Sequence, residues 1–182
     1  MKKDLDLVLF GATGFTGRYA AARLQQVIPT GLRWGIAGRR PAQLEAIKQR
    51  FGLAEDVQVV VADSDDPSSV GAMAARARVL LSTAGPYTRF GSPIVAACVE
   101  HHTHYADITG ETVWVRRMID AHHDHAQRAG TFLVPFAGYD SIPSDLATWM
   151  LVRHLRESRG QATSRVYGSF RSTGGFSGGT AA

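Results

Sequence analysis

The sequence predicts an α/β protein whose main part is a doubly wound parallel sheet. Short apolar runs alternate with longer stretches of helical periodicity from Leu5 to about Pro135, as in repeated βα units. A glycine-rich turn follows the first apolar run and opens the first helical stretch. The alternation stops after Pro135. We therefore expect a first domain over residues 1–138 and the start of a second, mixed α/β domain over residues 139–182.

Six apolar runs are expected to form strands. Several are apolar throughout, which suits parallel strands that helices cover on both faces. The expected strands are residues 7–10, 32–37, 57–61, 79–82, 104–106 and 131–134.

Four stretches with helical periodicity lie between these runs. Pro41, Pro67 and Pro93 are expected in first helical turns, where a missing N–H is tolerated. Gly52 and Gly130 are expected just past helix ends, where a left-handed residue is common. The expected helices are residues 15–27, 41–51, 92–101 and 111–129.

The region after Pro135 differs in character. We expect a helix over residues 142–155 and a strand of a different kind over residues 165–171. The glycine-rich end is typical of a linker or a disordered tail, but Phe176 and the neighbouring threonines favour an ordered turn at residues 174–179.

The composition argues against several classes of protein. The chain is 45% hydrophobic and 20% charged, as is usual for a soluble globular protein. Its net charge of +4 comes almost entirely from arginines, and these are scattered rather than clustered, which argues against a nucleic-acid partner. Cys98 is the only cysteine, which excludes an internal disulfide, and its apolar neighbours predict a buried structural thiol in a reducing compartment.

The first apolar run is too short for a signal peptide or a membrane span. We therefore expect a cytoplasmic protein without a transmembrane segment. Peripheral membrane contact and assembly into a homo-oligomer are left open.

The turn after the first expected strand carries the strongest functional signal. In this GxxGxxG pattern, Gly14 lets the backbone approach a diphosphate, and Gly17 lets the helix pack close to the strand. Free N–H groups at the helix start and the helix dipole attract phosphate. The context predicts a Rossmann-type dinucleotide site, rather than a purely structural turn, formed by Gly11, Ala12, Thr13, Gly14, Phe15, Thr16 and Gly17.

The end of the second expected strand predicts NADP(H) as the cofactor. An NAD enzyme usually has an acidic residue there, which binds the ribose 2′-hydroxyl. This chain has Arg39 and Arg40 and no carboxylate, so we expect charge-assisted hydrogen bonds to a 2′-phosphate. The alternative is that both arginines are solvated loop charges.

Two later loops are expected to contact the rest of the cofactor. Asp63 and Ser64 are expected near the adenine ring, although Asp63 is equally suited to cap the next helix. The loop after the fourth expected strand lies at the carboxyl edge of the sheet, where ligands bind, and is expected near the nicotinamide. It consists of Thr83, Ala84, Gly85, Pro86 and Tyr87.

The Tyr-x-x-x-Lys pair of short-chain dehydrogenases is absent, because no tyrosine has a lysine four residues later. Other segments resemble the saccharopine dehydrogenase-like family, especially its bacterial branch that includes the trans-acting enoyl reductases of lipid biosynthesis. These segments are the glycine turn, residues 37–39, Gly85, Pro86 and Tyr87 with Gly91, residues 105–111 and residues 138–146.

The resemblance extends over essentially the whole chain and implies an NADP(H)-dependent oxidoreductase. It implies hydride transfer to or from an organic substrate, either a small molecule or a lipid-linked enoyl or carbonyl compound. Because family members are considerably longer, we expect a fragment that is mainly the cofactor-binding portion, with a truncated second domain. The competing hypothesis is a sensor or interaction module that binds NADP(H) without turnover.

Two groups of residues are candidates for the chemistry. Tyr105, Asp107 and Glu111 follow a strand at the cofactor side of the sheet, where a proton donor or substrate contact is expected. The structural alternative is that Thr109 caps the next helix while Glu111 favours its positive end. The second group is Tyr139 and Asp140, at the expected domain junction, where ligand sites often lie.

Six histidines lie close together in sequence but are not expected to bind a metal. On a helix only His122 and His125 would share a face, and no carboxylate or cysteine completes the set. The histidines are His101, His102, His104, His122, His123 and His125.

Overall fold

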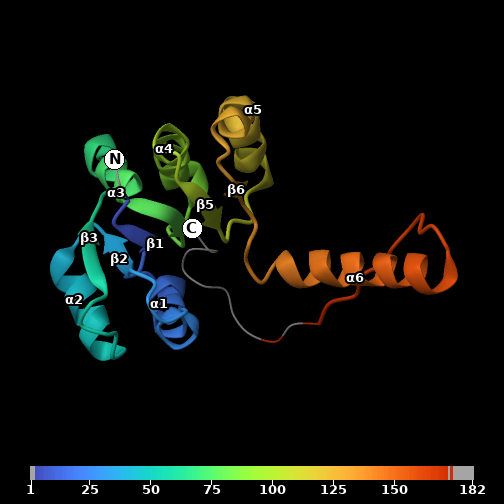
Figure 1. Cartoon of the computed structure of the whole chain (residues 1–182), viewed down its shortest axis with the longest axis horizontal. Helices are drawn as coiled ribbons and strands as arrows, with labels where there is room; N and C mark the ends of the chain where they lie inside the picture. Colours follow the sequence, from blue (N-terminus) through green and yellow to red (C-terminus); the bar gives the residue numbers. More distant parts are fainter. Residues whose placement is uncertain (1–2, 172, 174–182) are drawn as a thin grey trace.

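The computed structural model describes residues 3–171 and residue 173 of the chain (Figure 1). Six strands form one sheet in the order β3-β2-β1-β4-β5-β6, and every neighbouring pair is parallel. The predicted doubly wound α/β fold is therefore confirmed. The strands are β1 (Leu5–Phe10), β2 (Trp34–Gly38), β3 (Gln58–Val61), β4 (Ala77–Ser82), β5 (His104–Asp107) and β6 (Leu133–Val134).

Helices cover both faces of this sheet. In Figure 1, α3, α4 and α5 lie on one side of the sheet, and α1 and α2 lie on the other. This division follows from right-handed crossovers, because the chain builds outward from β1 in one direction and then returns to continue from β4 in the other. The helices are α1 (Phe15–Val27), α2 (Pro41–Arg50), α3 (Pro67–Arg76), α4 (Tyr87–Glu100), α5 (Thr112–Ala129) and α6 (Ile142–Arg159).

The alternation of side chains along β1 divides the core between the two faces. Val8 and Phe10 pack in a cluster with buried residues of α3, α4 and α5. Leu9 points to the opposite face and packs with buried residues of α1 and α2. Cys98 belongs to the first cluster, as predicted for a structural thiol, and burial raises its pKa to about 12.

The start of α4 differs from the prediction. The helix begins at Tyr87, five residues before the expected start at residue 92, and Pro93 lies inside it rather than in its first turn. Pro86, at the N-cap position, has no side chain that can accept a capping hydrogen bond, so the sequence contains no local N-cap signal at this helix start. The prediction had placed Pro67 in a first helical turn without giving the range of that helix, and the structure confirms this position, because Pro67 opens α3.

The region after β6 is only partly as expected. Helix α6 continues to Arg159, and it projects away from the sheet with none of its residues buried (Figure 1). Residues 165–171 form no strand, so that prediction is wrong: none of the six described strands lies beside them to complete a ladder, and Tyr167 and Phe170 are exposed. The turn expected at residues 174–179 lies outside the described residues, and the boundary between residues 138 and 139 stays a prediction.

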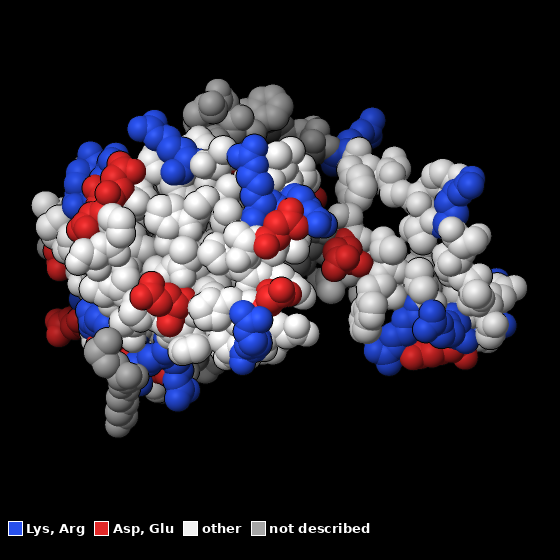
Figure 2. Space-filling view, turned by 90° about the horizontal axis from the view of Figure 1, so that it is seen from above, with Lys and Arg blue, Asp and Glu red and all other residues white. Residues whose placement is uncertain are grey.

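Charged side chains of both signs are interspersed on the face of the molecule that Figure 2 shows. Figure 2 also shows a group of blue and red side chains on the part of the molecule that stands apart from the main body. Arg153 and Glu157 form an ion pair on α6. No described helix is long and apolar enough to span a membrane.

Two helical glycines provide a test of the packing between α4 and α5. A Cβ atom on Gly91 of α4 would lie 2.5 Å from Cζ2 of Trp114 on α5, whereas one on Gly71 of α3 would only reach Nε2 of His101 at 3.4 Å. We expect Gly91→Ala to lower the free energy of unfolding by about 1–3 kcal/mol through overpacking. The control, Gly71→Ala, should raise it by about 0.5–1 kcal/mol, since alanine favours helix. Chemical denaturation measures both, and equal effects of the two substitutions would contradict this packing.

Candidate functional site

A cleft of about 240 Å³ lies at the carboxyl edge of the sheet, beside the point where strand order reverses between β1 and β4. Because all strands are parallel, the loops that follow β1, β2, β3 and β4 meet at this edge. The cleft is lined by Phe10, Gly11, Thr13, Gly14, Gly38, Arg39, Ala62, Asp63, Ser64, Thr83, Ala84, Gly85 and Phe90.

The glycine turn at this cleft depends on two close approaches. Gly11 has φ +83°, and a Cβ atom on it would lie 2.9 Å from the amide nitrogen of Ala84. A Cβ atom on Gly17 would lie 2.1 Å from the carbonyl oxygen of Gly11, so only glycine fits there. The first turn of α1 is thereby held directly against the end of β1.

The N-terminus of α1 is free of any cap from its own side chains. Gly14 occupies the N-cap position, and the first turn contains no acidic residue. The first N–H groups of a helix have no partner within the helix, so they suit an anion in the cleft. Within the predicted turn, Gly11, Thr13 and Gly14 line the cleft, Ala12 and Gly17 are buried, and Phe15 and Thr16 are exposed.

The structure separates the two arginines that follow β2. Arg39 lines the cleft, whereas Arg40 is the N-cap residue of α2 and is not part of the lining. Both side chains are exposed, and neither forms an ion pair with a described acidic residue. Gly38, between the strand and Arg39, is another cleft residue and carries no side chain that could repel a phosphate.

Asp63 and Ser64 line the cleft as a pair after β3. An oxygen of the Asp63 carboxylate accepts a hydrogen bond from the amide of Asp65 at 3.2 Å. The N-cap of α3 is Asp66, whose carboxylate accepts from the amide of Ser68 at 3.0 Å. The alternative role of Asp63 as the cap of this helix is therefore wrong.

Only three of the five residues predicted in the loop after β4 line the cleft. Thr83, Ala84 and Gly85 line the cleft, and the amide of Thr83 donates to the carbonyl oxygen of Phe10 at 3.0 Å. Tyr87 is buried instead: its hydroxyl donates to the carbonyl oxygen of Ser82 at 3.0 Å. Pro86 is the N-cap residue of α4 and does not line the cleft.

Four residues of the cleft lining were not predicted as site residues: Phe10, Gly38, Ala62 and Phe90. A sequence signal existed for three of them, because Phe10 ends an expected strand, and Gly38 and Ala62 each directly follow one. Phe90 had no such signal, since it lies in the part of α4 that the prediction missed.

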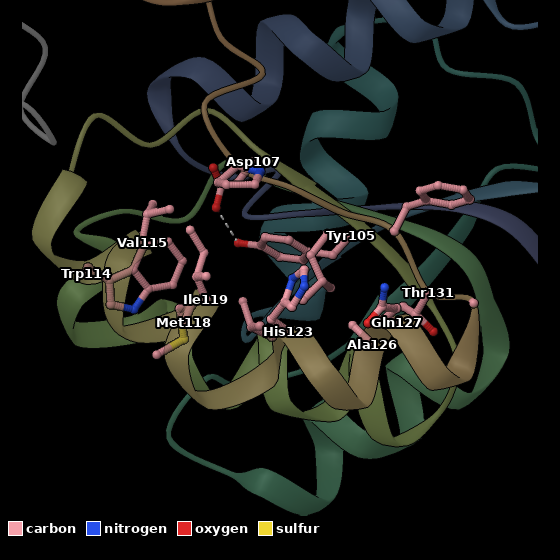
Figure 3. A pocket seen from close by; sticks show the side chains of 15 residues that line it. Tyr105, Asp107, Trp114, Val115, Met118, Ile119, His123, Ala126, Gln127 and Thr131 are labelled. Carbon is pink, nitrogen blue, oxygen red and sulfur yellow. Dashed lines mark hydrogen bonds between the residues drawn. The ribbon is translucent and has the colours of Figure 1, made fainter.

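Tyr105 and Asp107 lie together on a second pocket, of about 490 Å³, between α5 and the last two strands (Figure 3). The Tyr105 hydroxyl donates to one oxygen of the Asp107 carboxylate at 2.8 Å. The other oxygen accepts from the amides of Thr109 at 3.0 Å and Phe136 at 3.2 Å. The rest of this pocket is mainly apolar, with Trp114 among the side chains that α5 contributes.

Burial alters the acidity of both groups. It raises the pKa of Asp107, although the hydrogen bonds from Thr109, Tyr105 and Phe136 favour the carboxylate. Burial and the neighbouring Asp107 carboxylate also raise the pKa of Tyr105 far above its ordinary value. Tyr105 therefore retains its proton at neutral pH, and the pair fixes the loop that leaves β5.

Glu111 is not part of this pair. Its carboxylate accepts from the amide of Tyr87 at 2.6 Å and from the amide of Thr88 at 2.7 Å, and it also accepts from the Thr88 hydroxyl. Partial burial opposes its ionisation, but the hydrogen bonds from Thr88 and Tyr87 outweigh this and lower the pKa of Glu111. Glu111 thus binds the positive end of α4, not that of the helix it precedes, while Thr109 accepts from the Glu111 amide.

The remaining candidates lie apart from both pockets. Tyr139 and Asp140 are exposed in the segment between β6 and α6 and line neither the cleft nor the apolar pocket. Among the residues that the structure describes, no group of three or more His, Cys, Asp or Glu side chains is arranged to hold a metal ion.

Comparison with known proteins identifies similar sequences over most of the chain. The model of the saccharopine dehydrogenase NADP binding domain matches residues 7–134. A trans-acting enoyl reductase of Mycobacterium leprae is 44% identical over 159 residues, which cover 87% of this chain and 38% of that protein. A trans-acting enoyl reductase of Mycobacterium ulcerans is 45% identical over 157 residues, which cover 86% of this chain and 37% of that protein.

The fold has a counterpart among solved structures. The apo saccharopine dehydrogenase (L-Glu forming) of Saccharomyces cerevisiae superimposes with a TM-score of 0.68 at 17% sequence identity, over 84% of this chain and 32% of that one. At this identity the likeness concerns the fold. The chain spans less than two fifths of the length of the two mycobacterial relatives.

Substitutions of Asp107 test the buried pair. Asp107→Ala leaves the Tyr105 hydroxyl and the amides of Thr109 and Phe136 without a partner, so we expect the free energy of unfolding to fall by roughly 3 kcal/mol or more. Asp107→Asn keeps an oxygen for both amides and an NH₂ that donates to Tyr105, so we expect a loss of about 1 kcal/mol or less at neutral pH. Denaturation of both variants measures this, and equal losses would contradict it.

The raised pKa of Asp107 also predicts a pH dependence. Between the ordinary aspartate pKa and this raised value, the folded protein binds more protons than the unfolded chain. The stability of the wild type relative to Asp107→Asn should therefore decrease as the pH rises through that range. A constant difference would show that this carboxyl titrates normally.

Proposed function

The chain belongs to the saccharopine dehydrogenase NADP-binding domain family, with NADP(H) as its cofactor, and from this premise we propose that the cleft at the carboxyl edge of the sheet is the cofactor site of an oxidoreductase. The observation that carries the proposal is the position of Arg39. It lies on the same cleft as the uncapped N-terminus of α1, and no acidic side chain stands at the end of β2.

The residues of the cleft fit a dinucleotide with a 2′-phosphate. The first turn of α1 offers N–H groups to the diphosphate, Gly14 lets the backbone approach it, and Gly11 and Gly17 allow the close packing that holds this turn in place. Arg39 offers guanidinium donors to the 2′-phosphate, while Asp63 and Ser64 border the adenine side. Thr83, Ala84 and Gly85 border the nicotinamide side.

NADPH, when bound, supplies the hydride. The contribution of this chain is to bind and orient the cofactor: the glycine turn fixes the diphosphate, and the loop of residues 83–85 shapes the space beside the nicotinamide. We propose hydride transfer to an enoyl or carbonyl group of an organic, lipid-linked substrate. The names of the mycobacterial relatives support the enoyl group.

Among the five candidate catalytic residues, the two in the segment after β6 are the best placed to contact a substrate. Tyr105 and Asp107 are buried and hydrogen-bonded to each other, and Glu111 accepts hydrogen bonds from α4. Tyr139 and Asp140 are exposed where the chain leaves the sheet, so they are the proposed substrate contacts within this chain.

Replacing Arg39 and Arg40 in turn tests whether Arg39 binds the 2′-phosphate of the cofactor. We expect Arg39→Ala to weaken NADPH binding roughly 10- to 100-fold, since charge-assisted hydrogen bonds are lost, and to leave NADH binding nearly unchanged. Arg40→Ala is the matched control and should change NADPH affinity less than about twofold, because Arg40 does not line the cleft. Calorimetric titration with both nucleotides measures this. Equal affinity of the wild type for NADPH and NADH, or an unchanged preference in Arg39→Ala, would refute the proposal.

Turnover distinguishes an oxidoreductase from a module that only binds NADP(H). We expect the natural protein that contains this chain to oxidise NADPH in the presence of an enoyl or carbonyl thioester, and Arg39→Ala to raise the KM for NADPH. The loss of NADPH absorbance measures the rate with the thioester, and the appearance of NADPH absorbance measures it for the comparison pair of saccharopine and NADP⁺. Tight NADPH binding without a change of absorbance in either reaction would favour the binding module.

A further inference from the structure

Helix α4 begins directly after the cleft but has no cap of its own. Pro86, at its N-cap position, provides no side-chain acceptor, and the first turn of the helix contains no acidic residue. The amides of Tyr87 and Thr88 instead donate to the two carboxylate oxygens of Glu111, which lies in the loop after β5. A residue 24 positions away from Tyr87 in sequence thus supplies the cap.

The loop that this cap anchors forms one wall of the cleft. At its start, the Thr83 amide donates to Phe10, and Ala84 lies so close to Gly11 that no side chain fits between them. At its end, Glu111 holds the first two residues of α4. Residues 83–85 are therefore fixed between the glycine turn and the Glu111 carboxylate.

We propose that Glu111 is a positioning residue of the cofactor site, which holds the loop of residues 83–85 at the distance from the glycine turn that the nicotinamide half of NADP(H) requires. The proposal rests on the proposed function, because it needs the dinucleotide in this cleft. Glu111 acts through the backbone of α4 and exchanges no proton with the substrate.

The contact with Glu111 also makes the N-terminus of α4 electrostatically different from that of α1 at the same edge of the sheet. The carboxylate of Glu111 neutralises the positive end of α4, whereas the first turn of α1 has neither a side-chain cap nor an acidic residue. The diphosphate is therefore directed to α1. The wall formed by residues 83–85 is left for the uncharged amide of the nicotinamide.

Two ligands separate the halves of the site. Adenosine 2′,5′-bisphosphate carries the adenine, the 2′-phosphate and a 5′-phosphate but lacks the nicotinamide half, so it reports on the adenosine side of the site and not on residues 83–85. We expect Glu111→Ala to weaken NADPH binding about tenfold, as for the loss of charge-assisted hydrogen bonds, and to change binding of the bisphosphate less than about twofold. Glu111→Gln keeps one acceptor oxygen and should give an intermediate loss for NADPH only.

Two variants on α4 serve as controls. Glu100→Ala removes an exposed carboxylate from the last turn of the same helix and should leave both affinities unchanged. Thr88→Val removes only the hydroxyl and keeps both amide contacts, so it should weaken NADPH binding less than Glu111→Ala does. Circular dichroism and thermal unfolding check that each variant is folded. If Glu111→Ala does not fold, Glu111→Gln decides.

Each outcome bears on the proposal. Selective loss of NADPH affinity supports it. An equal loss of affinity for both ligands would show that Glu111 stabilises the domain in general. Unchanged NADPH affinity would show that the contact between Glu111 and α4 does not affect the site. Either result overturns the proposal, while the proposed function stands. A wild-type chain that binds neither ligand would overturn the proposed function, and this inference with it.

Discussion

Gly17 lies so close to the carbonyl oxygen of Gly11 that even a single methyl group on Gly17 would collide, at 2.1 Å from that oxygen. The contact allows α1 to start directly against the end of β1, with its free N–H groups turned to the carboxyl edge of the sheet. Gly11 in turn leaves room for Ala84, so the loop after β4 closes over the same turn. Larger side chains at these positions would separate the elements that form the cleft.

The order of the strands supplies the other half of the arrangement. Because β2 and β4 flank β1 and all three strands are parallel, Arg39 and Thr83 arrive on opposite sides of the glycine turn. The positions of Arg39 and of the loop of residues 83–85 around the cleft are thus set by topology rather than by proximity in sequence. The buried pair of Tyr105 and Asp107 and the Glu111 carboxylate then fix the next loop along the sheet.

Features that depend on neighbours in sequence could be predicted. The strand, turn and helix that contain the glycine motif, and the basic end of β2, are local patterns whose chemistry is visible in the residues themselves. Features that depend on distant contacts could not. The start of α4 was missed because its cap comes from Glu111. Residues 165–171 were expected to be a strand, although no strand in the described part of the chain lies beside them. The start of α2 at Pro41 was predicted, and it makes Arg40 the N-cap residue; the charges of Arg39 and Arg40 alone did not show that only Arg39 lines the cleft.

A crystal structure of the chain with NADP⁺ tests the central claim most directly. We expect the diphosphate to lie on the first turn of α1, the 2′-phosphate to receive hydrogen bonds from Arg39, and the nicotinamide to lie beside residues 83–85. A dinucleotide bound elsewhere, or one in this cleft with its 2′-phosphate turned away from Arg39, would contradict it.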